Sequence, residues 1–348
     1  MINPEAQRII AQLNKKLGGG VVVVGSDITT EMVPRFTTGS VTWDYILGGG
    51  LPGNQWNELV GESSHGKSGL ALKLIAANQQ RDPEFTTVWV AAEQWVPQYA
   101  EMCGVDQSRV IVIETTVMEE AFDAVITFAE SKSVDCIVVD SLPALIPSPE
   151  VAKDMDEMTV GRGALLTNKF FRKVGAAMRR SLTEQERPVL GIIINQWRFK
   201  IGVMHGDPRT TPGGVGKDYA YFTRSEIKRD EWIEIGPSGN KKRIGQRTRI
   251  RTLKNKTAPP QRVAYVDFYF DEGGECLPGD YDFAKEIASL CAVKEIITRR
   301  GAWYFFKDLK WQGLDACIAS IREEVDLREE LERLALITTD APRPLEVQ

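Results

Sequence analysis

Histidine and cysteine are scarce in this chain of 348 residues, which contains two histidines and five cysteines. Short-spaced Cys and His residues are the usual mark of a structural metal site, and paired cysteines that of a disulfide framework. Here the histidines are His65 and His205, and no CxxC pair occurs. We therefore interpret the cysteines as ordinary thiols. They are Cys103, Cys136, Cys276, Cys291 and Cys317.

Long apolar runs are also missing. None approaches the ~18 residues that crossing a bilayer requires. The first ten residues, MINPEAQRII, have no basic segment followed by an apolar one, as a secretory signal would. We expect a cytoplasmic protein with no membrane partner. With 43% hydrophobic and 26% charged residues, the chain can form a large core and one or two smaller units.

Positive charge is not in excess, because the formal net charge is −5. This excludes a protein coated with basic residues. The distribution is uneven, however: residues 224–256 hold eleven Lys or Arg and four Asp or Glu, whereas residues 323–332 are rich in acid. A basic centre with an acidic end suits a protein that binds a polyanion locally and repels it elsewhere. A solvated hairpin and a solvated helix face would give the same pattern.

Strand and helix patterns alternate through the middle of the chain, and later segments alternate apolar and polar residues between turns. The first pattern predicts a mostly parallel sheet with helices on both faces, and the second an antiparallel extension of it. The fold class is therefore α/β. The expected parallel strands are 57–60, 87–91, 110–113, 136–139 and 189–194; the helices are 67–79, 119–131 and 163–184; the later strands are 221–227, 232–235, 246–253 and 262–270.

The two ends of the chain are expected to form smaller units. Residues 1–34 are predicted to be an oligomerisation arm, with an amphipathic helix over 4–17 and a short strand over 21–24. Such an arm cannot bury itself, so it must pack on this chain or on a neighbouring copy. Gly and Pro at 273–279 mark a boundary after a core of 35–273. Residues 274–348 are predicted to be a small α+β domain with one strand from Gly301, an acidic helix and a tail.

The eight residues GESSHGKS match the phosphate-binding pattern G-x-x-x-x-G-K-[ST] and lie between a predicted strand and a predicted helix. Backbone amides and the helix N-terminus supply positive potential to such a loop. Lys67 would pair with the β- and γ-phosphates, and the Ser68 hydroxyl would ligate Mg²⁺. The predicted loop contacts to the nucleotide are Gly61, Glu62, Ser63, Ser64, His65, Gly66, Lys67, Ser68 and Gly69.

Three polar residues at strand ends could complete this site. Asp140 ends an apolar strand and is the natural holder of Mg²⁺, directly or through water. Glu93 is the best candidate to activate the attacking water. Gln196 could sense the γ-phosphate and report it to the loop that follows. Each has an ordinary alternative, as a strand-end carboxylate, a surface or capping glutamate, and a strand-end hydrogen bond.

The segment Asn195–Gly214, NQWRFKIGVMHGDPRTTPGG, follows a buried strand and has no usable periodicity. A structureless loop of this length inside a compact domain is usually functional or disordered. It interleaves cations such as Arg198 and Lys200 with apolar groups such as Phe199 and Ile201. That combination can hold phosphates and insert between bases, so it suits a nucleic-acid contact.

These motifs together resemble the RecA recombinase family of bacteria and phages. The resemblance implies a RecA-type P-loop ATPase core whose N-terminal arm packs on the adjacent subunit. It further implies a helical filament on single-stranded DNA, ATP between subunits, DNA-dependent ATP hydrolysis, and strand exchange with double-stranded DNA in repair and the SOS response. Single-strand-binding or loader proteins could be partners. The resembling stretches are Thr37–Ser68, CIVVDSLPALIP, INQWRFKIGVMHGDPRTTPGG, Leu253–Gln261 and Gly301–Lys307.

The resemblance also implies roles for further residues. Lys254 and Lys256 match a pair that reaches the neighbour's ATP and stabilises developing charge. Tyr99 matches a tyrosine that stacks on adenine. Two DNA loops are expected, at 153–161 and 197–211. The expected DNA contacts, phosphate-facing, wedge-like or through backbone amides, are Arg162, Arg172, Arg198, Phe199, Lys200, Ile201, Gly213 and Gly214.

Several residues depart from the family pattern: His65 in the phosphate loop, Leu165 and Asp218 where basic residues are usual, and His205 in place of an aromatic one. They affect DNA affinity and tuning more than the class of reaction. A ring-shaped helicase and a recombination mediator with a degenerate site are the alternatives. The Lys254 and Lys256 pair speaks against the first, and the intact Lys67 against the second.

Overall fold

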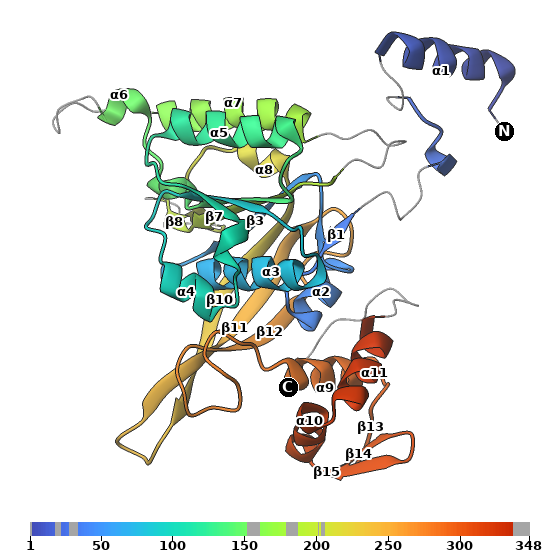
Figure 1. Cartoon of the computed structure of the whole chain (residues 1–348), viewed down its shortest axis with the longest axis vertical. Coiled ribbons are helices and arrows are strands. Elements are labelled where there is room, and N and C mark those ends of the chain that lie inside the picture. Colours follow the sequence, from blue (N-terminus) through green and yellow to red (C-terminus); the bar gives the residue numbers. More distant parts are fainter. Residues whose placement is uncertain are drawn as a thin grey trace.

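The computed structural model describes residues 2–17, 22–27, 34–151, 161–178, 187–200, 202 and 206–336. Its centre is an eight-stranded sheet in the order β12-β11-β10-β3-β7-β6-β4-β5 (Figure 1). The strands from β3 to β5 are parallel, β10 is parallel to β3, and β11 and β12 add antiparallel pairs. This confirms the predicted α/β class with its antiparallel extension. The strands are β3 Gln55–Gly61, β4 Thr87–Ala91, β5 Val110–Ile113, β6 Cys136–Asp140, β7 Leu190–Gln196, β10 Tyr221–Ile235, β11 Lys242–Asn255 and β12 Val263–Tyr269.

Helices cover both faces of the sheet (Figure 1). Alternate residues of each central strand enter opposite hydrophobic clusters: Val138 packs with the α3 side, and Ile137 and Val139 with the α5 and α7 side. Because side chains alternate along a strand, burial on both faces makes strands such as β6 and β7 apolar over most of their length. One side holds α2 Val41–Leu47, α3 Lys67–Arg81 and α4 Pro97–Met102; the other holds α5 Met118–Ser131, α7 Arg162–Ala177 and α8 Gly216–Ala220. The predicted extension of α7 to 184 falls on residues 179–186, outside the described residues.

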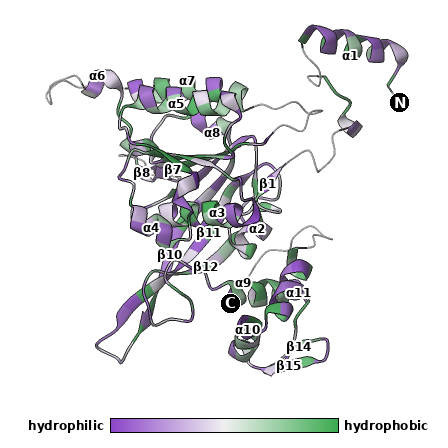
Figure 2. Ribbon diagram, viewed as in Figure 1, coloured by the Kyte–Doolittle hydropathy of each residue, from purple (hydrophilic) through white to green (hydrophobic). Residues whose placement is uncertain are grey.

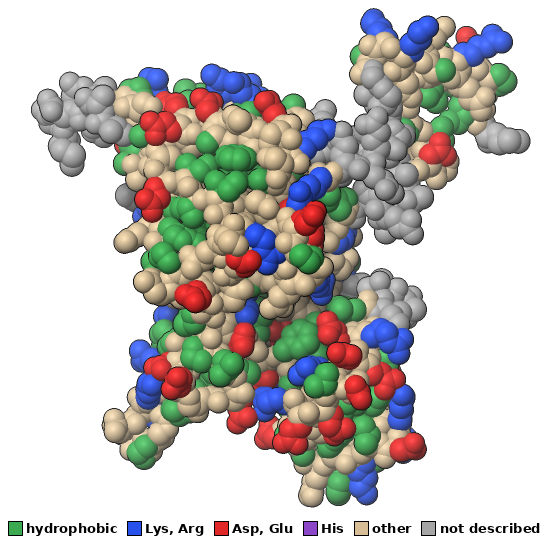
Figure 3. Space-filling model, in the orientation of Figure 1, with side chains coloured by type: hydrophobic (Ala, Val, Ile, Leu, Met, Phe, Trp, Pro, Cys, Tyr) green, Lys and Arg blue, Asp and Glu red, His purple; other side chains and the backbone are tan. Residues whose placement is uncertain are grey.

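The N-terminal arm lies apart from the core (Figure 1). Its helix α1, Pro4–Leu17, buries none of its residues, and Figure 3 shows hydrophobic and basic side chains exposed on it. The predicted strand at 21–24 is wrong over its described part, because 22–24 pair with no strand and lead into the short 3₁₀ helix η1, Gly25–Asp27. The Asn14 side chain instead bonds both the N–H and the carbonyl of Val22, at 2.8 and 2.7 Å. These backbone groups are therefore satisfied without a sheet partner.

The two predicted strands at 221–227 and 232–235 are one long strand, β10. Its first half, Tyr221–Ile227, pairs with β3 on one side, and Thr223–Ile235 pair with β11 on the other. Beyond β3 the two strands form a hairpin that projects from the sheet (Figure 1) and is largely hydrophilic (Figure 2). Three register shifts interrupt the β10–β11 pairing. The base of this hairpin consequently lies next to the strand that leads into the phosphate loop.

The C-terminal part packs against the core. Its helix α9 contacts α2, and one hydrophobic cluster contains both Ile46 of α2 and Ile287 of α9. The single strand predicted from Gly301 is a three-stranded sheet. Figure 3 shows acidic side chains gathered on this part. Its elements are α9 Phe283–Val293, β13 Thr298–Arg300, β14 Trp303–Phe306, β15 Leu309–Gln312, α10 Leu314–Glu323 and α11 Val325–Leu336.

Shorter elements complete the described part of the chain. They are the β1–β2 pair, Arg35–Phe36 with Leu51–Pro52, the helix α6, Ser148–Val151, the 3₁₀ helices η3 and η4, Gln107–Arg109 and Leu142–Ala144, and the β8–β9 pair, Arg198–Phe199 with Arg209–Thr210. Across the described ranges, no helix is both long and apolar enough to span a bilayer.

Candidate nucleotide and DNA sites

The phosphate loop turns tightly between β3 and α3. Gly66, which precedes the first residue of α3, has φ 89°, in the left-handed region. A Cβ there would lie 2.6 Å from Nε2 of Gln246, and a Cβ at Gly61 would lie 2.2 Å from the carbonyl oxygen of Ile227. Glycine is therefore favoured at Gly66 by its backbone conformation, and at Gly61 by the lack of space beside the Ile227 backbone.

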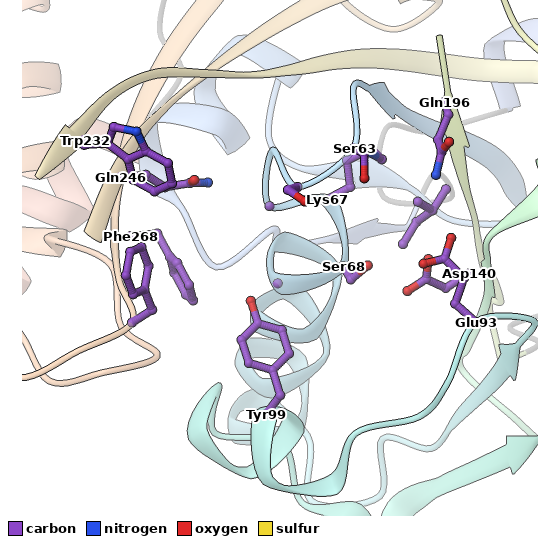
Figure 4. Close-up of a pocket in the computed structure, with 15 residues that line it drawn as sticks. Ser63, Lys67, Ser68, Glu93, Tyr99, Asp140, Gln196, Trp232, Gln246 and Phe268 are labelled. Atoms are coloured by element: carbon purple, nitrogen blue, oxygen red, sulfur yellow. The ribbon is translucent and has the colours of Figure 1, made fainter. Parts of the chain in front are cut away.

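A cavity of about 380 Å³ opens beside this loop (Figure 4). Ten of the predicted site residues line it, whereas Gly61, Glu62 and His65 do not. Figure 4 shows Gln196, Asp140 and Glu93 on one side of the start of α3, and Trp232, Gln246 and Phe268 on the other. The cavity thus has a polar end and an aromatic end. The ten residues are Ser63, Ser64, Gly66, Lys67, Ser68, Gly69, Glu93, Tyr99, Asp140 and Gln196.

Lys67 is buried, with its ammonium folded over the loop. Its Nζ donates hydrogen bonds to the carbonyl oxygens of Glu62 at 2.6 Å and Gly61 at 3.3 Å. Burial lowers the pKa of Lys67, and the carboxylates of Asp140 and Glu93 partly oppose that shift. A buried cation with acceptors only from the backbone can interact strongly with an anionic phosphate.

Asp140 lies beside Ser68 and Glu93. Burial raises the pKa of Asp140 to about 6; the Ser68 hydroxyl and Lys67 oppose the shift, and the Glu93 carboxylate adds to it. The backbone N–H of Glu93 donates to the carbonyl oxygen of Asp140 at 3.1 Å. Two carboxylates and a hydroxyl therefore converge where β4 and β6 end.

This donor set fits Mg²⁺. No group of three or more His, Cys, Asp or Glu side chains is arranged to hold a metal among the residues that the structure describes. Mg²⁺, however, usually takes one or two protein oxygens and completes its shell with substrate phosphates and water. The Ser68 hydroxyl and the Asp140 carboxylate supply oxygens of that kind next to the phosphate loop.

The aromatic end of the cavity was only partly predicted. Tyr99 of α4 reaches the start of α3, where a Cβ at Gly69 would lie 2.4 Å from the Tyr99 hydroxyl. Trp232 and Phe270 meet edge to face, with ring centroids 6.2 Å apart. Apolar ring surfaces of this kind suit a flat heteroaromatic base. The lining residues that sequence reasoning missed are Ile194, Trp232, Gln246, Phe268 and Phe270.

Lys254 and Lys256 do not line this cavity. The Nζ of Lys254 donates to the main-chain oxygen of Asp218 at 2.6 Å, and that of Lys256 lies 3.5 Å from the main-chain oxygen of Tyr219. Both lysines are thus held at α8, and within a single chain the structure does not bring them to the nucleotide cavity.

The segment predicted to be structureless begins with a hairpin. Arg198 and Phe199 of β8 pair with Thr210 and Arg209 of β9, which corrects that prediction. Arg198, Lys200 and Phe199 are exposed, Phe199 at 64%, and neither cation has an ion pair within the described ranges. Arg209 differs, because Asp207 and Glu226 hold it and its guanidinium lies 4.8 Å from the centroid of the Trp197 ring. Ile201 and His205 lie outside the described residues.

Gly213 and Gly214, with φ of 96° and 77°, lead from this hairpin into α8. A Cβ on Gly214 would lie 3.0 Å from Cβ of Ala164, so the segment packs closely on α7. Arg162 and Arg172 are exposed on that same helix. The predicted first DNA loop falls on 153–160, outside the described residues, and on Gly161, which precedes α7.

The sheet, the strand–loop–helix unit and the cavity at the carboxyl end of the parallel strands define an α/β protein of the P-loop class. Within that class the chain belongs to the RecA family, because the model of the RecA N-terminal domain matches residues 5–275. It is 33% identical over 340 residues to Protein RecA of Synechocystis sp., covering 96% of this chain and 91% of that one.

Other relatives agree. Protein RecA of Roseiflexus sp. strain RS-1 is 34% identical over 344 residues, which cover 96% of this chain and 91% of that protein. Protein RecA of Staphylococcus aureus strain JH9 is 33% identical over 328 residues, which cover 93% of this chain and 89% of that protein. Family membership supports a recombinase role for this chain, with binding of DNA and ATP.

Proposed function

We propose that the chain is an ATP-dependent DNA recombinase that forms helical filaments on single-stranded DNA and promotes homologous pairing and strand exchange with double-stranded DNA. One observation carries this proposal: β7 ends at Gln196 inside the nucleotide cavity, and the next residues enter the exposed, basic β8–β9 hairpin. Nucleotide binding at Gln196 would therefore alter the position of the hairpin, and DNA binding at the hairpin would alter the position of Gln196.

The cavity residues divide the work of ATP hydrolysis. Lys67 and the loop amides bind the β- and γ-phosphates, and Tyr99 with the neighbouring rings holds the base. Ser68 and Asp140 hold Mg²⁺, which when bound neutralises charge on the phosphates. Glu93 accepts the proton of the attacking water, and Gln196 contacts the γ-phosphate.

A second subunit completes the site. Lys254 and Lys256 do not line their own chain's cavity; they act instead on the nucleotide of a neighbouring copy, where two cations would stabilise developing negative charge. The arm, residues 1–34, packs on the adjacent subunit through the exposed Ile9, Leu13 and Leu17 of α1. The core of 35–273 carries both sites, and 274–348 forms the C-terminal domain.

DNA lies against the β8–β9 hairpin and α7. Arg198 and Lys200 contact phosphates, Phe199 and Ile201 insert between bases, and the amides of Gly213 and Gly214 approach the backbone. Arg162 and Arg172 add positive charge from α7. We further propose that the protein acts in the cytoplasm, in DNA repair and the SOS response, with single-strand-binding or loader proteins.

The test is ATP hydrolysis with and without single-stranded DNA, for the wild type and for Lys67→Ala. Lys73→Ala is the matched control, since Lys73 lies on the same helix but pairs with Asp280 outside the cavity. We expect DNA to stimulate the wild type and Lys73→Ala, and Lys67→Ala to lose hydrolysis. A wild-type hydrolysis rate that single-stranded DNA does not change, or a normal hydrolysis rate in Lys67→Ala, contradicts the proposal. Catalytic unwinding of a forked duplex would indicate a ring helicase instead.

A further inference from the structure

Glu58, Arg224 and Asp218 form an ion network where β3, β10 and α8 meet, buried at Glu58 and partly exposed at Asp218. Arg224 of β10 donates to the carboxylates of both Glu58, on β3, and Asp218, on α8. Glu58 is fully buried, and Arg224 is its direct partner in the β3–β10 pairing. The network thus ties α8 to two adjacent strands of the central sheet.

One end of this network reaches the glycines proposed to approach DNA. Lys217 of α8 is 1% exposed, and its Nζ donates to Oδ1 of Asp218 and to the carbonyl oxygen of Gly214, both at 2.9 Å. The main-chain oxygen of Asp218 also accepts a hydrogen bond of 2.6 Å from Nζ of Lys254. Hydrogen bonds through Lys217 and Asp218 therefore connect Gly214 to Lys254.

The other end reaches the proposed γ-phosphate sensor. Nδ2 of Asn195 donates to Oε1 of Glu58 at 2.8 Å, and Oδ1 of Asn195 accepts from the backbone N–H of Gln196 at 2.9 Å. Gln196, Gly214 and Lys254 thus all connect to one hydrogen-bonded network.

The network joins strands of the central sheet to a short helix. Glu58 and Arg224 belong to paired strands in the interior of the sheet, whereas α8 is a five-residue helix between Gly214 and β10. Charge-assisted hydrogen bonds in a low-dielectric interior are strong, and removing one partner leaves the other charge buried and unpaired. A displacement of α8 therefore moves the Asp218 carbonyl relative to the sheet, and with it the acceptor of Lys254.

We propose that Asp218 and Arg224 are positioning residues for Lys254, which transmit contact of DNA with the Gly213–Gly214 segment to the lysine used by the neighbouring subunit's nucleotide. This inference rests on the proposed function. In the isolated subunit, the Asp218 carbonyl holds the Lys254 ammonium on its own chain. DNA that engages the glycines shifts α8 and redirects Lys254 toward the neighbour.

The test compares Asp218→Asn and Arg224→Lys with the wild type. Asp218→Asn keeps the size and the backbone carbonyl but removes the charge that Arg224 and Lys217 hold. Arg224→Lys keeps the charge but cannot fork to two carboxylates at once. We expect the factor by which single-stranded DNA raises kcat to fall about tenfold in each, the size of one charged hydrogen bond. The KM for ATP and the affinity for DNA should change less than about threefold, and Asp218→Glu should recover part of the stimulation.

Arg247→Lys is the matched control, because Arg247 lies on the same hairpin and also bridges two carboxylates, those of Glu231 and Asp267. It should keep full stimulation. An equal loss in Arg247→Lys, or a parallel loss of DNA affinity and ATP affinity in Asp218→Asn, assigns the network a merely structural role and overturns the inference. If the wild type is stimulated and both network variants keep that stimulation, this inference alone fails. If the wild type shows no stimulation by DNA, the proposed function fails with it.

Discussion

The Ser141 hydroxyl donates a hydrogen bond of 2.7 Å to Oε1 of Glu93. Ser141 directly follows Asp140, and the backbone N–H of Glu93 donates to the Asp140 carbonyl. The ends of β4 and β6 are thus tied together twice. The direction of the proposed general base is therefore fixed by the residue next to the proposed Mg²⁺ ligand.

Glu93→Gln is expected to lower single-turnover ATP hydrolysis by about 10²-fold or more, because an amide cannot accept the proton of water. Nucleotide affinity should stay within a few-fold of the wild type. Ser141→Ala should lower the single-turnover rate by about tenfold or less, because it removes the hydrogen bond that orients Glu93 but leaves the carboxylate in place. Near-normal hydrolysis in Glu93→Gln would assign the base elsewhere.

The raised pKa of Asp140 predicts a pH-dependent stability without nucleotide. Its pKa is about 6 in the folded protein against the ordinary value of 3.8 for an aspartate, so between these values the folded state binds more protons than the unfolded state. Stability from this group is therefore present below about pH 4 and is lost as the pH rises through 6. Asp140→Asn should gain on the order of 2 kcal/mol in unfolding free energy at pH 7.5, and almost nothing near pH 4.

Denaturant unfolding across this pH range measures the difference. Asp106→Asn is a control for which the stability change should have the opposite sign, because hydrogen bonds from Ser108 and Arg109 lower the pKa of Asp106. That variant should lose stability at neutral pH rather than gain it. A stability gain in Asp140→Asn that is independent of pH would contradict the account.

The phosphate end of the cavity could be predicted from the sequence because it is local. One loop between a strand and a helix positions Lys67 and Ser68, and Asp140 ends an apolar strand of the same parallel sheet. Carboxyl ends of parallel strands meet at one edge of a sheet, so short-range patterns were enough. The sheet itself was predictable for the same reason.

The aromatic end could not be predicted, because it depends on pairing between distant segments. Trp232 and Gln246 face each other across the β10–β11 hairpin, and they reach the cavity since β10 pairs with β3. No local pattern encodes that pairing. The β8–β9 hairpin was missed for another reason: strands of two residues are too short to show an alternating pattern.

Arg198→Ala is expected to weaken binding to single-stranded DNA and to reduce the slope of log affinity against log salt by about 0.7, because one phosphate contact is lost. ATP affinity should be unchanged. Arg209→Ala is the control from the paired strand: Asp207 and Glu226 already neutralise Arg209, so its slope should change less. Fluorescence anisotropy at several salt concentrations gives both slopes. Equal slopes for Arg198→Ala and the wild type would count against the proposed contact.

Mixing two inactive variants tests whether neighbouring subunits share the site. Lys67→Ala lacks the phosphate lysine, and Lys254→Ala lacks the lysine proposed to act on the neighbour. In a mixed filament, some interfaces join an intact cavity to an intact Lys254, so DNA-stimulated hydrolysis should reappear at up to about a quarter of the wild-type rate if assembly is random. Lys256→Ala should likewise complement Lys67→Ala. If the mixture of Lys67→Ala and Lys254→Ala is as inactive as each variant alone, Lys254 does not act in a site shared between subunits.

Electron microscopy of the protein with long single-stranded DNA, Mg²⁺ and a slowly hydrolysed ATP analogue tests the central claim most directly. The account predicts regular helical filaments that require both the nucleotide and the DNA, and that become fewer as salt rises, since phosphate contacts release counterions. The absence of regular filaments at every salt concentration tried, from a protein shown to be folded, would contradict it.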